Sequence, residues 1–272
     1  MVRFLSSRLI CLVWLVPASI FCQPSSANGQ KDTTEARSVK AENIIEIIPP
    51  GESTAEGGSF YSYRKALFDL LRIHNISFDF IGSLKGAGTD WDTNHFGMSG
   101  KACKDLSDWI KNNSTSYKAD IIMLWEDTND CGLGWQYYGT PKASLNTLID
   151  DICMNQPQAE LFVSTIPMMG DNAYIPPMTS GGANANVNAY NKAIHILIAV
   201  KRAQGKKVHF VDTGGDILAA DLTDGIHPTQ NGYDKMAPYW FKAITPFIGL
   251  NSDYGYSDQK KLGLLKIRFF NI

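Results

Sequence analysis

The order of apolar and amphipathic segments along the chain predicts an α/β fold. Five short runs rich in Ile, Val and Phe are each followed by a longer segment with apolar residues at helical spacing. Strands that alternate with helices are joined by crossovers, so they pair in parallel in a sheet covered on both faces. The expected strands are Ile44–Ile48, Phe78–Gly82, Ala119–Trp125, Glu160–Pro167 and Lys207–Asp212. The expected helices are Tyr61–Asn75, Lys101–Asn113, Pro141–Gln156, Asn184–Gly205 and a last one that begins near Thr229.

The N-terminus has the pattern of a secretory signal peptide. Arg3 and Arg8 precede an apolar run at 9–21, and small residues follow at 25–27. A membrane anchor is the alternative, but about 20 apolar residues are needed to span a bilayer, and this shorter run contains Pro17. The 272 residues can bury one complete core. We expect a signal peptide at 1–27, a linker at 28–42, a folded domain at 43–250 and a tail of unknown role at 251–272.

Charge and sequons favour an exported protein over a nucleic-acid binder. The 25 Lys and Arg residues nearly balance 27 Asp and Glu residues, and they form no concentrated basic face. Three Asn-x-Ser/Thr sequons begin at Asn75, Asn112 and Asn113. We therefore expect a secreted, extracellular glycoprotein that is a monomer, binds no nucleic acid and is free of the membrane after signal cleavage.

Polar residues suited to catalysis follow the expected strands. Ser53 comes after the first strand in "PPGEST", and Gly100 lies after the second in "NHFGMSG". Asn129 follows the third strand in "DTND", and Asp224 and His227 lie after the fifth in "DGIHP". Ligands of an open α/β sheet bind at the carboxyl ends of its strands. We therefore expect these residues to meet at one edge of the sheet.

This set of residues fits acyl transfer. A serine hydroxyl needs an adjacent base, and His227 has a carboxylate three residues before it, just ahead of the last helix. Asp224 would orient the ring of His227 and stabilise its protonated form. The oxyanion requires donors aimed at it in advance. We expect these to be the backbone amides of Ser53 and Gly100 and the side-chain amide of Asn129.

Each of these residues also has an ordinary structural interpretation. Ser53 and Asn129 are common turn residues, and Asp224 could begin a helix-entry turn. The Asp-x-x-His spacing could hold a metal, but no further cluster of ligands completes such a site, so we expect no metal. The Gly-x-Ser-x-Gly nucleophile motif is absent, and Ser99 in "GMSG" comes nearest to it.

Together and in this order, the four segments resemble the SGNH (GDSL-type) hydrolases, which are named for Ser, Gly, Asn and His in four sequence blocks. More closely, residues 44–248 resemble the carbohydrate esterase family 3 acetylxylan esterases, including "FDFIGS" and "DGIHPTQNGYDKMA". The resemblance implies a three-layer αβα sandwich around a five-stranded parallel sheet, of SGNH-hydrolase or flavodoxin-like type. It also implies that no metal or organic cofactor is used and that O-acetyl groups are removed from xylan.

The chain departs from the family pattern in three of the blocks. Glu52 stands where the family has Asp, which should perturb the turn without removing the nucleophile. Asp127 stands where the third block has Gly; Asp tolerates unusual backbone angles, but its charge could oppose the oxyanion. Phe96 and Met98 replace Glu and His in a loop that helps line the substrate cleft of the family. These changes bear more on specificity than on the reaction.

The cysteines outside the signal peptide are Cys103, Cys131 and Cys153. Cys103 follows Gly100 and Cys131 follows Asn129, so both should lie at the active-site edge, while Cys153 lies about 18 Å along the next helix at 1.5 Å per residue. We predict a Cys103–Cys131 disulfide and a buried, free Cys153.

Four aromatic residues fall in loops at the same edge, where they either stack on sugar rings or pack the loops onto the core. They are Trp91, Trp135, Tyr137 and Tyr138.

The sequence thus predicts a secreted serine esterase that removes acetyl groups from plant cell-wall polysaccharide, with acetylxylan the favoured substrate, through an acetyl-enzyme on Ser53. One alternative is an esterase of the same class that acts on rhamnogalacturonan or lipid. Another is a carbohydrate-binding protein with a decayed active site, which Glu52 and Asp127 make conceivable.

Overall fold

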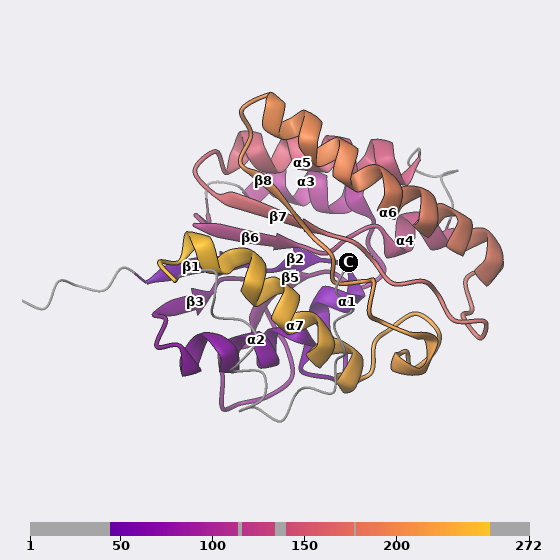
Figure 1. The fold of residues 1–272 in the computed structure, drawn as a ribbon, viewed down its shortest axis with the longest axis horizontal. Helices are drawn as coiled ribbons and strands as arrows, with labels where there is room; N and C mark the ends of the chain where they lie inside the picture. The colour runs from indigo at the N-terminus through magenta and orange to yellow at the C-terminus, as the bar shows by residue number, and fades with distance from the viewer. Residues whose placement is uncertain (1–43, 114–115, 134–139, 177, 251–272) are drawn as a thin grey trace, which may run out of the picture. The chain divides into compact units, whose positions relative to one another are not determined.

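The computed structural model describes residues 44–113, 116–133, 140–176 and 178–250 (Figure 1). The expected signal peptide, linker and tail lie outside these ranges, as do Trp135, Tyr137 and Tyr138. Within the described ranges, no helix combines the length and apolar character that crossing a membrane requires.

The centre of the domain is a five-stranded, all-parallel sheet, which confirms the predicted α/β fold. Its strand order is β3-β1-β6-β7-β8. Each strand begins within two residues of the position expected from the sequence. The strands are β1 (Ile45–Ile48), β3 (Phe78–Phe80), β6 (Ile121–Leu124), β7 (Glu160–Ser164) and β8 (Val208–Val211).

Helices cover both faces of the sheet and complete the three layers (Figure 1). One face carries α2 (Ser62–Ile73) and α7 (Gln230–Ile244), which pack against each other. The other carries α3 (Cys103–Asn113), α5 (Pro141–Asn155) and α6 (Ser180–Ala203). Shorter helical segments are α1 (Ser53–Glu56), α4 (Thr128–Leu133), η1 (Ala219–Asp221) and η2 (Thr245–Phe247).

Threonine caps fix where three of the long helices begin. The hydroxyls of Thr140, Thr179 and Thr229 accept hydrogen bonds from backbone amides in the first turns of α5, α6 and α7. Each cap satisfies a donor that the helix itself leaves free. The cap at Thr229 confirms the predicted start of the last helix, which immediately follows the loop that carries Asp224 and His227.

A stack of aromatic rings joins the first layer of helices to the end of β6. The ring of Tyr63 on α2 stacks at 5.9 Å from that of Trp125 and at 5.6 Å from that of Trp240 on α7. All three side chains are fully buried. Aromatic pairs of this geometry add to the free energy gained from burial alone, so α2 and α7 are held firmly beside the carboxyl edge of the sheet.

A second, smaller sheet was missed by the sequence analysis. Its strands, in the order β2-β5-β4, are β2 (Pro50–Gly51), β4 (Leu84–Lys85) and β5 (Asn94–Gly97). The expectation that 94–97 are loop residues is therefore wrong. The strand forms because it pairs in parallel with the segment that leads into Ser53, and the Met98 amide donates to Gly51 O at 2.9 Å. Two-residue strands leave no periodic pattern in a sequence.

Arg64 on α2 ties the turn at Ser53 to this small sheet. Its guanidinium donates to Ala55 O at 3.3 Å and Glu56 O at 3.1 Å on α1, and to Thr93 O at 2.7 Å beside β5. The side chain is fully buried, and burial lowers the pKa of Arg64 from 12.5 to about 10. One buried, still cationic group therefore satisfies several carbonyls from two segments at once.

We expect Arg64→Lys to lower the free energy of unfolding by about 2–4 kcal/mol, because one ammonium cannot replace the planar fork and leaves buried carbonyls without a donor. Urea denaturation measures the change. Arg202→Lys, at an exposed position on α6, is the matched control and should change stability by less than about 0.5 kcal/mol. Equal stability of the two variants would contradict the role given to Arg64.

Candidate active site

A strand-to-helix turn places Ser53 at the carboxyl edge of the sheet. Ser53 is the first residue of α1, and the helix ends one turn later at Gly57, whose φ is +92°. A side chain at Gly51 would put its Cβ 2.0 Å from Trp125 O, so only glycine allows this close approach to the end of β6. The "PPGEST" segment is thus shaped by tertiary contacts around the serine.

Ser53, His227 and Asp224 lie in a single chain of contacts. Ser53 Oγ is 2.9 Å from His227 Nε2, and His227 Nδ1 is 2.7 Å from Asp224 Oδ2. The other Asp224 oxygen, Oδ1, accepts from the backbone amides of His227 at 2.8 Å and Ile226 at 2.9 Å. The structure therefore brings together a hydroxyl, a base and an orienting carboxylate from sequence positions 174 residues apart.

The environment of Asp224 favours its ionised form. Partial burial opposes ionisation, but the hydrogen bonds from His227 and Ile226 outweigh it, so the pKa of Asp224 lies below its usual 3.8. A lowered pKa means that the carboxylate stays charged at neutral pH and is protonated only in acid. Asp224 can therefore fix the Nδ1–H tautomer of His227 and leave Nε2 free to accept a proton.

Asn129 and Gly100 lie at the same edge, where Asn129 contacts the loop that carries Gly100. Asn129 was expected in a loop after β6, but it lies in the first turn of α4. Its Nδ2 donates to Lys101 O at 2.7 Å. Gly100 is exposed and has a φ of +71°, a conformation that glycine adopts without strain. Asn129 of the predicted third block is thus hydrogen-bonded to the residue that follows Gly100 of the second.

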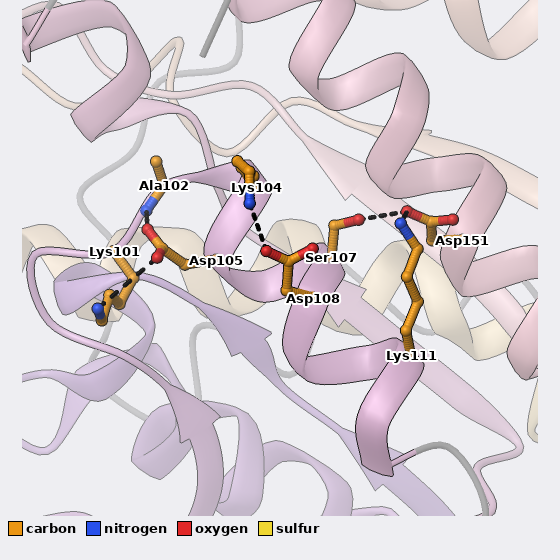
Figure 2. A network of polar contacts seen from close by, with 8 residues as sticks. All are labelled: Lys101, Ala102, Lys104, Asp105, Ser107, Asp108, Lys111 and Asp151. Atoms are coloured by element: carbon orange, nitrogen blue, oxygen red, sulfur yellow. Dashed lines mark hydrogen bonds and ion pairs between the residues drawn. The ribbon is translucent and has the colours of Figure 1, made fainter. Parts of the chain in front are cut away.

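A network of charged side chains fixes the helix that follows Gly100 (Figure 2). Asp105 accepts from the Ala102 amide at 3.1 Å, which caps the start of α3, and it faces Lys101 Nζ at 3.7 Å. Farther along the helix, Asp151 on α5 contacts Ser107 and pairs with Lys111 at 2.9 Å. The middle and last turn of α3 are therefore anchored to α5, while Asp105 fixes the start of the helix beside Gly100.

Glu52 contacts the hydroxyl of Ser53, which the sequence did not reveal. Its Oε2 lies 2.6 Å from Ser53 Oγ, and its side chain is fully buried. From the sequence, Glu52 was expected only to perturb the turn. The one signal available was the change from the family's Asp, because an added methylene alters how far the carboxyl group reaches.

Buried acidic groups gather beneath Asn129. Glu126, Asp127 and Asp130 are each at most 5% exposed. Burial is the largest cause that raises their pKa values, and the neighbouring carboxyl groups raise them further. Raised pKa values favour the neutral acids, so the negative charge that Asp127 was expected to place near an oxyanion is suppressed.

The predicted disulfide between Cys103 and Cys131 is not formed, and that prediction is wrong. Both are buried free thiols, and Cys103 Sγ donates instead to Asp127 Oδ1 at 3.3 Å. Cys153 is free, as expected, but only half-buried. The sequence placed both cysteines at the correct edge, but side-chain direction is not encoded in spacing.

In the described part of the chain, one group of potential metal ligands comes together. Cys103, Asp127 and Asp130 each offer an atom within 4.8 Å of the others. Two of these ligands already bond to each other, and burial, followed by the nearby carboxyl groups, raises the pKa of the Cys103 thiol well above 9.0. A protonated thiol is a poor ligand, and we give this group no catalytic part.

Several other residues named from the sequence have structural positions. Phe96 is buried in β5 against the ring of Trp109, 4.2 Å away, so it packs in the core and does not line a cleft. Trp91 is 9% exposed and lies under the Arg64 guanidinium, which favours packing over sugar stacking. Asn75 and Asn112 are exposed, while Asn113 Nδ2 donates to Trp109 O at 2.9 Å. Glycosylation of the three sequons stays a prediction.

The profile of the GDSL-like lipase/acylhydrolase family matches residues 51–235, and the chain belongs to this family. A solved structure of a family 3 carbohydrate esterase from Clostridium thermocellum is 29% identical, with a TM-score of 0.62, over 75% of this chain and 97% of that one. A family 3 carbohydrate esterase from Talaromyces cellulolyticus, 19% identical with a TM-score of 0.61 over 75% of this chain and 98% of that one, shares the fold.

Two curated relatives are matched over only part of their length. A multidomain esterase of Ruminococcus flavefaciens is 28% identical over 242 residues, and a putative endoglucanase X of Acetivibrio thermocellus is 29% identical over 145 residues. The matches cover 76% and 51% of this chain, but only 29% and 54% of those relatives.

Asp127 adopts a φ of +92°, so the position favours glycine. We expect Asp127→Gly to be more stable than Asp127→Ala by about 1 kcal/mol, because both remove the carboxyl group and only alanine strains the backbone. Thermal unfolding of the two proteins measures the difference. An alanine variant as stable as the glycine variant would show that the backbone is not strained here.

Proposed function

We propose that this protein is a secreted serine esterase that removes O-acetyl groups from plant cell-wall polysaccharide, with acetylxylan the favoured substrate. The observation that carries the proposal is the chain of contacts from Ser53 Oγ to His227 Nε2 and from His227 Nδ1 to Asp224. Membership of a family of lipases and acylhydrolases supports the same reaction class.

In the first half of the reaction, Ser53 attacks the acetyl carbonyl. His227 Nε2 accepts the proton of Ser53 Oγ as the new carbon–oxygen bond forms, and Asp224 stabilises the charged ring. The amides of Ser53 and Gly100 and the Asn129 side chain donate to the oxyanion. The bond to the sugar oxygen then breaks, that oxygen takes the proton from His227, and acetyl-Ser53 remains.

In the second half, water replaces the sugar. His227 accepts a proton from the water as its oxygen attacks the acetyl carbon, and the same three donors hold the second oxyanion. The bond to Ser53 Oγ breaks, Oγ regains a proton from His227, and acetic acid leaves and releases its remaining proton to solvent as acetate. Neither half requires a group from outside the chain other than substrate and water.

The carbohydrate substrate is supported by likeness. The family 3 carbohydrate esterase of Clostridium thermocellum carries its substrate class in its name. It is 29% identical to this chain, and the match covers 97% of its length. Export is supported by the N-terminal pattern of positive residues followed by an apolar run. An extracellular esterase would meet insoluble plant polymers, which cannot enter a cell.

We expect Ser53→Ala to lower acetate release from acetylated xylan by more than about 10³-fold, because the nucleophile is lost. The control is Ser99→Ala, at the exposed residue before Gly100, and this variant should retain activity. Enzymatic assay of free acetate measures both. Loss of activity in the Ser99 variant alone would move the nucleophile, and hydrolysis of p-nitrophenyl acetate without release from xylan would overturn acetylxylan as the substrate.

A further inference from the structure

We propose that Asn184 on α6 is a positioning residue for the reaction, because it holds the backbone segment that packs against the loop of Asp224 and His227. The inference rests on the proposed serine esterase reaction and adds a residue that lies outside the groups in contact with substrate. Asn184 begins the asparagine-rich run "NANVNAYN" near the start of α6.

The Asn184 side chain satisfies both backbone groups of Met169, which lies beyond the end of β7. The Met169 amide donates to Asn184 Oδ1 at 2.7 Å, and Asn184 Nδ2 donates to Met169 O at 2.8 Å. An asparagine carries a donor and an acceptor on one planar group, so it can pair with a single residue as a neighbouring strand would. This pair of hydrogen bonds fixes the backbone of Met169 relative to α6.

The residues that follow Met169 lie directly against the loop that carries Asp224. The Gly170 amide donates to Gly225 O at 2.8 Å, and the Ala173 amide donates to Gly170 O at 3.0 Å. Gly225 has a φ of +82°, and a Cβ at this position would lie 2.6 Å from Ala173 N. Since Gly225 directly follows Asp224, the position of the loop depends on the segment that Asn184 holds.

The same helix also holds α4, which carries Asn129. Asn186 on α6 donates from Nδ2 to Cys131 O at 3.0 Å. The side chain of Met169 is 6% exposed, and its Cε would lie 3.2 Å from a Cβ added at Gly132 on α4. The contacts of α6 therefore set the backbone on the side of the proposed base and on the side of the proposed oxyanion donors.

The inner face of α6 is buried, so the helix is a firm support for these contacts. Val187, Tyr190 and Ile194 are each at most 2% exposed. Proton transfer requires His227 Nε2 to stay within hydrogen-bond reach of Ser53 Oγ, and a displacement of about 1 Å can slow an enzyme about 10²-fold. Loss of the Asn184 contacts should therefore slow the chemical step and leave substrate binding nearly unchanged.

Asn191, two turns farther along α6, provides a matched control. It bonds Ile166 in the same way: the Ile166 amide donates to Asn191 Oδ1 at 3.1 Å, and Asn191 Nδ2 donates to Ile166 O at 2.8 Å. Ile166 lies against Gly214, where an added Cβ would be 2.4 Å from Ile166 C. The two asparagines thus make the same hydrogen bonds, and they differ in the segment that each one holds.

Asn184→Ala and Asn191→Ala test the proposal with p-nitrophenyl acetate as substrate, below the melting temperatures of both variants. Both should lose similar stability, because each loses two hydrogen bonds. We expect kcat of Asn184→Ala to be about tenfold or more below that of Asn191→Ala, with KM values within about threefold of each other. Equal kcat values, or a raised KM with unchanged kcat in Asn184→Ala, would overturn the proposal.

Gly170→Ala decides the question even if Asn184→Ala does not fold, because it keeps both asparagines. Its Cβ would lie 3.1 Å from Gly225 Cα, so the segment and the loop must move apart by a few tenths of an ångström. We expect kcat to fall at least about threefold with KM unchanged. A kcat equal to that of the wild-type enzyme would contradict the proposed link.

Ser53→Ala separates this inference from the proposed function. Hydrolysis that survives in Ser53→Ala overturns the serine esterase itself. An inactive Ser53→Ala enzyme, together with equal kcat values for Asn184→Ala and Asn191→Ala, overturns only the positioning role of Asn184.

Discussion

The contact between Ser53 Oγ and His227 Nε2 is the interaction on which the proposed chemistry depends, and it joins the two ends of the fold. Ser53 follows β1, and His227 follows β8, which two other strands separate from β1 in the sheet. The segment after β8 must therefore return to the first strand, and packing of α7 against α2 holds it there. Any loss of that helix pair would separate Ser53 from His227.

The site is built on groups that are costly to bury and that other contacts hold in place. Asp127 has a positive φ, and Glu52 and Glu126 are buried carboxyl groups. Such features persist only where the surrounding structure determines them strongly. Here Arg64 bonds the turn at Ser53 to the small sheet, and the stacking of the Tyr63 ring on Trp125 holds α2 in place.

The main sheet and the residues at its carboxyl edge could be predicted from the sequence. The spacing of apolar residues and the polar residues that follow each strand are both local patterns. These patterns placed Ser53, Asn129, Asp224 and His227 at this edge, and their catalytic roles stay a prediction. The β2–β5 pairing could not be predicted, since β2 has only two residues and therefore shows no periodic pattern. The prediction of a Cys103–Cys131 disulfide was wrong, and the contact between Glu52 and Ser53 was missed. Both depend on side-chain directions that tertiary packing sets.

The most direct test of the central claim is covalent labelling with a serine-reactive fluorophosphonate, followed by intact mass spectrometry and peptide mapping. The account predicts one adduct, on the peptide that contains Ser53, formed at least about 10²-fold more slowly in His227→Ala because the hydroxyl has lost its base. An adduct on Ser99, or labelling of Ser53 at the same rate without His227, would contradict the account.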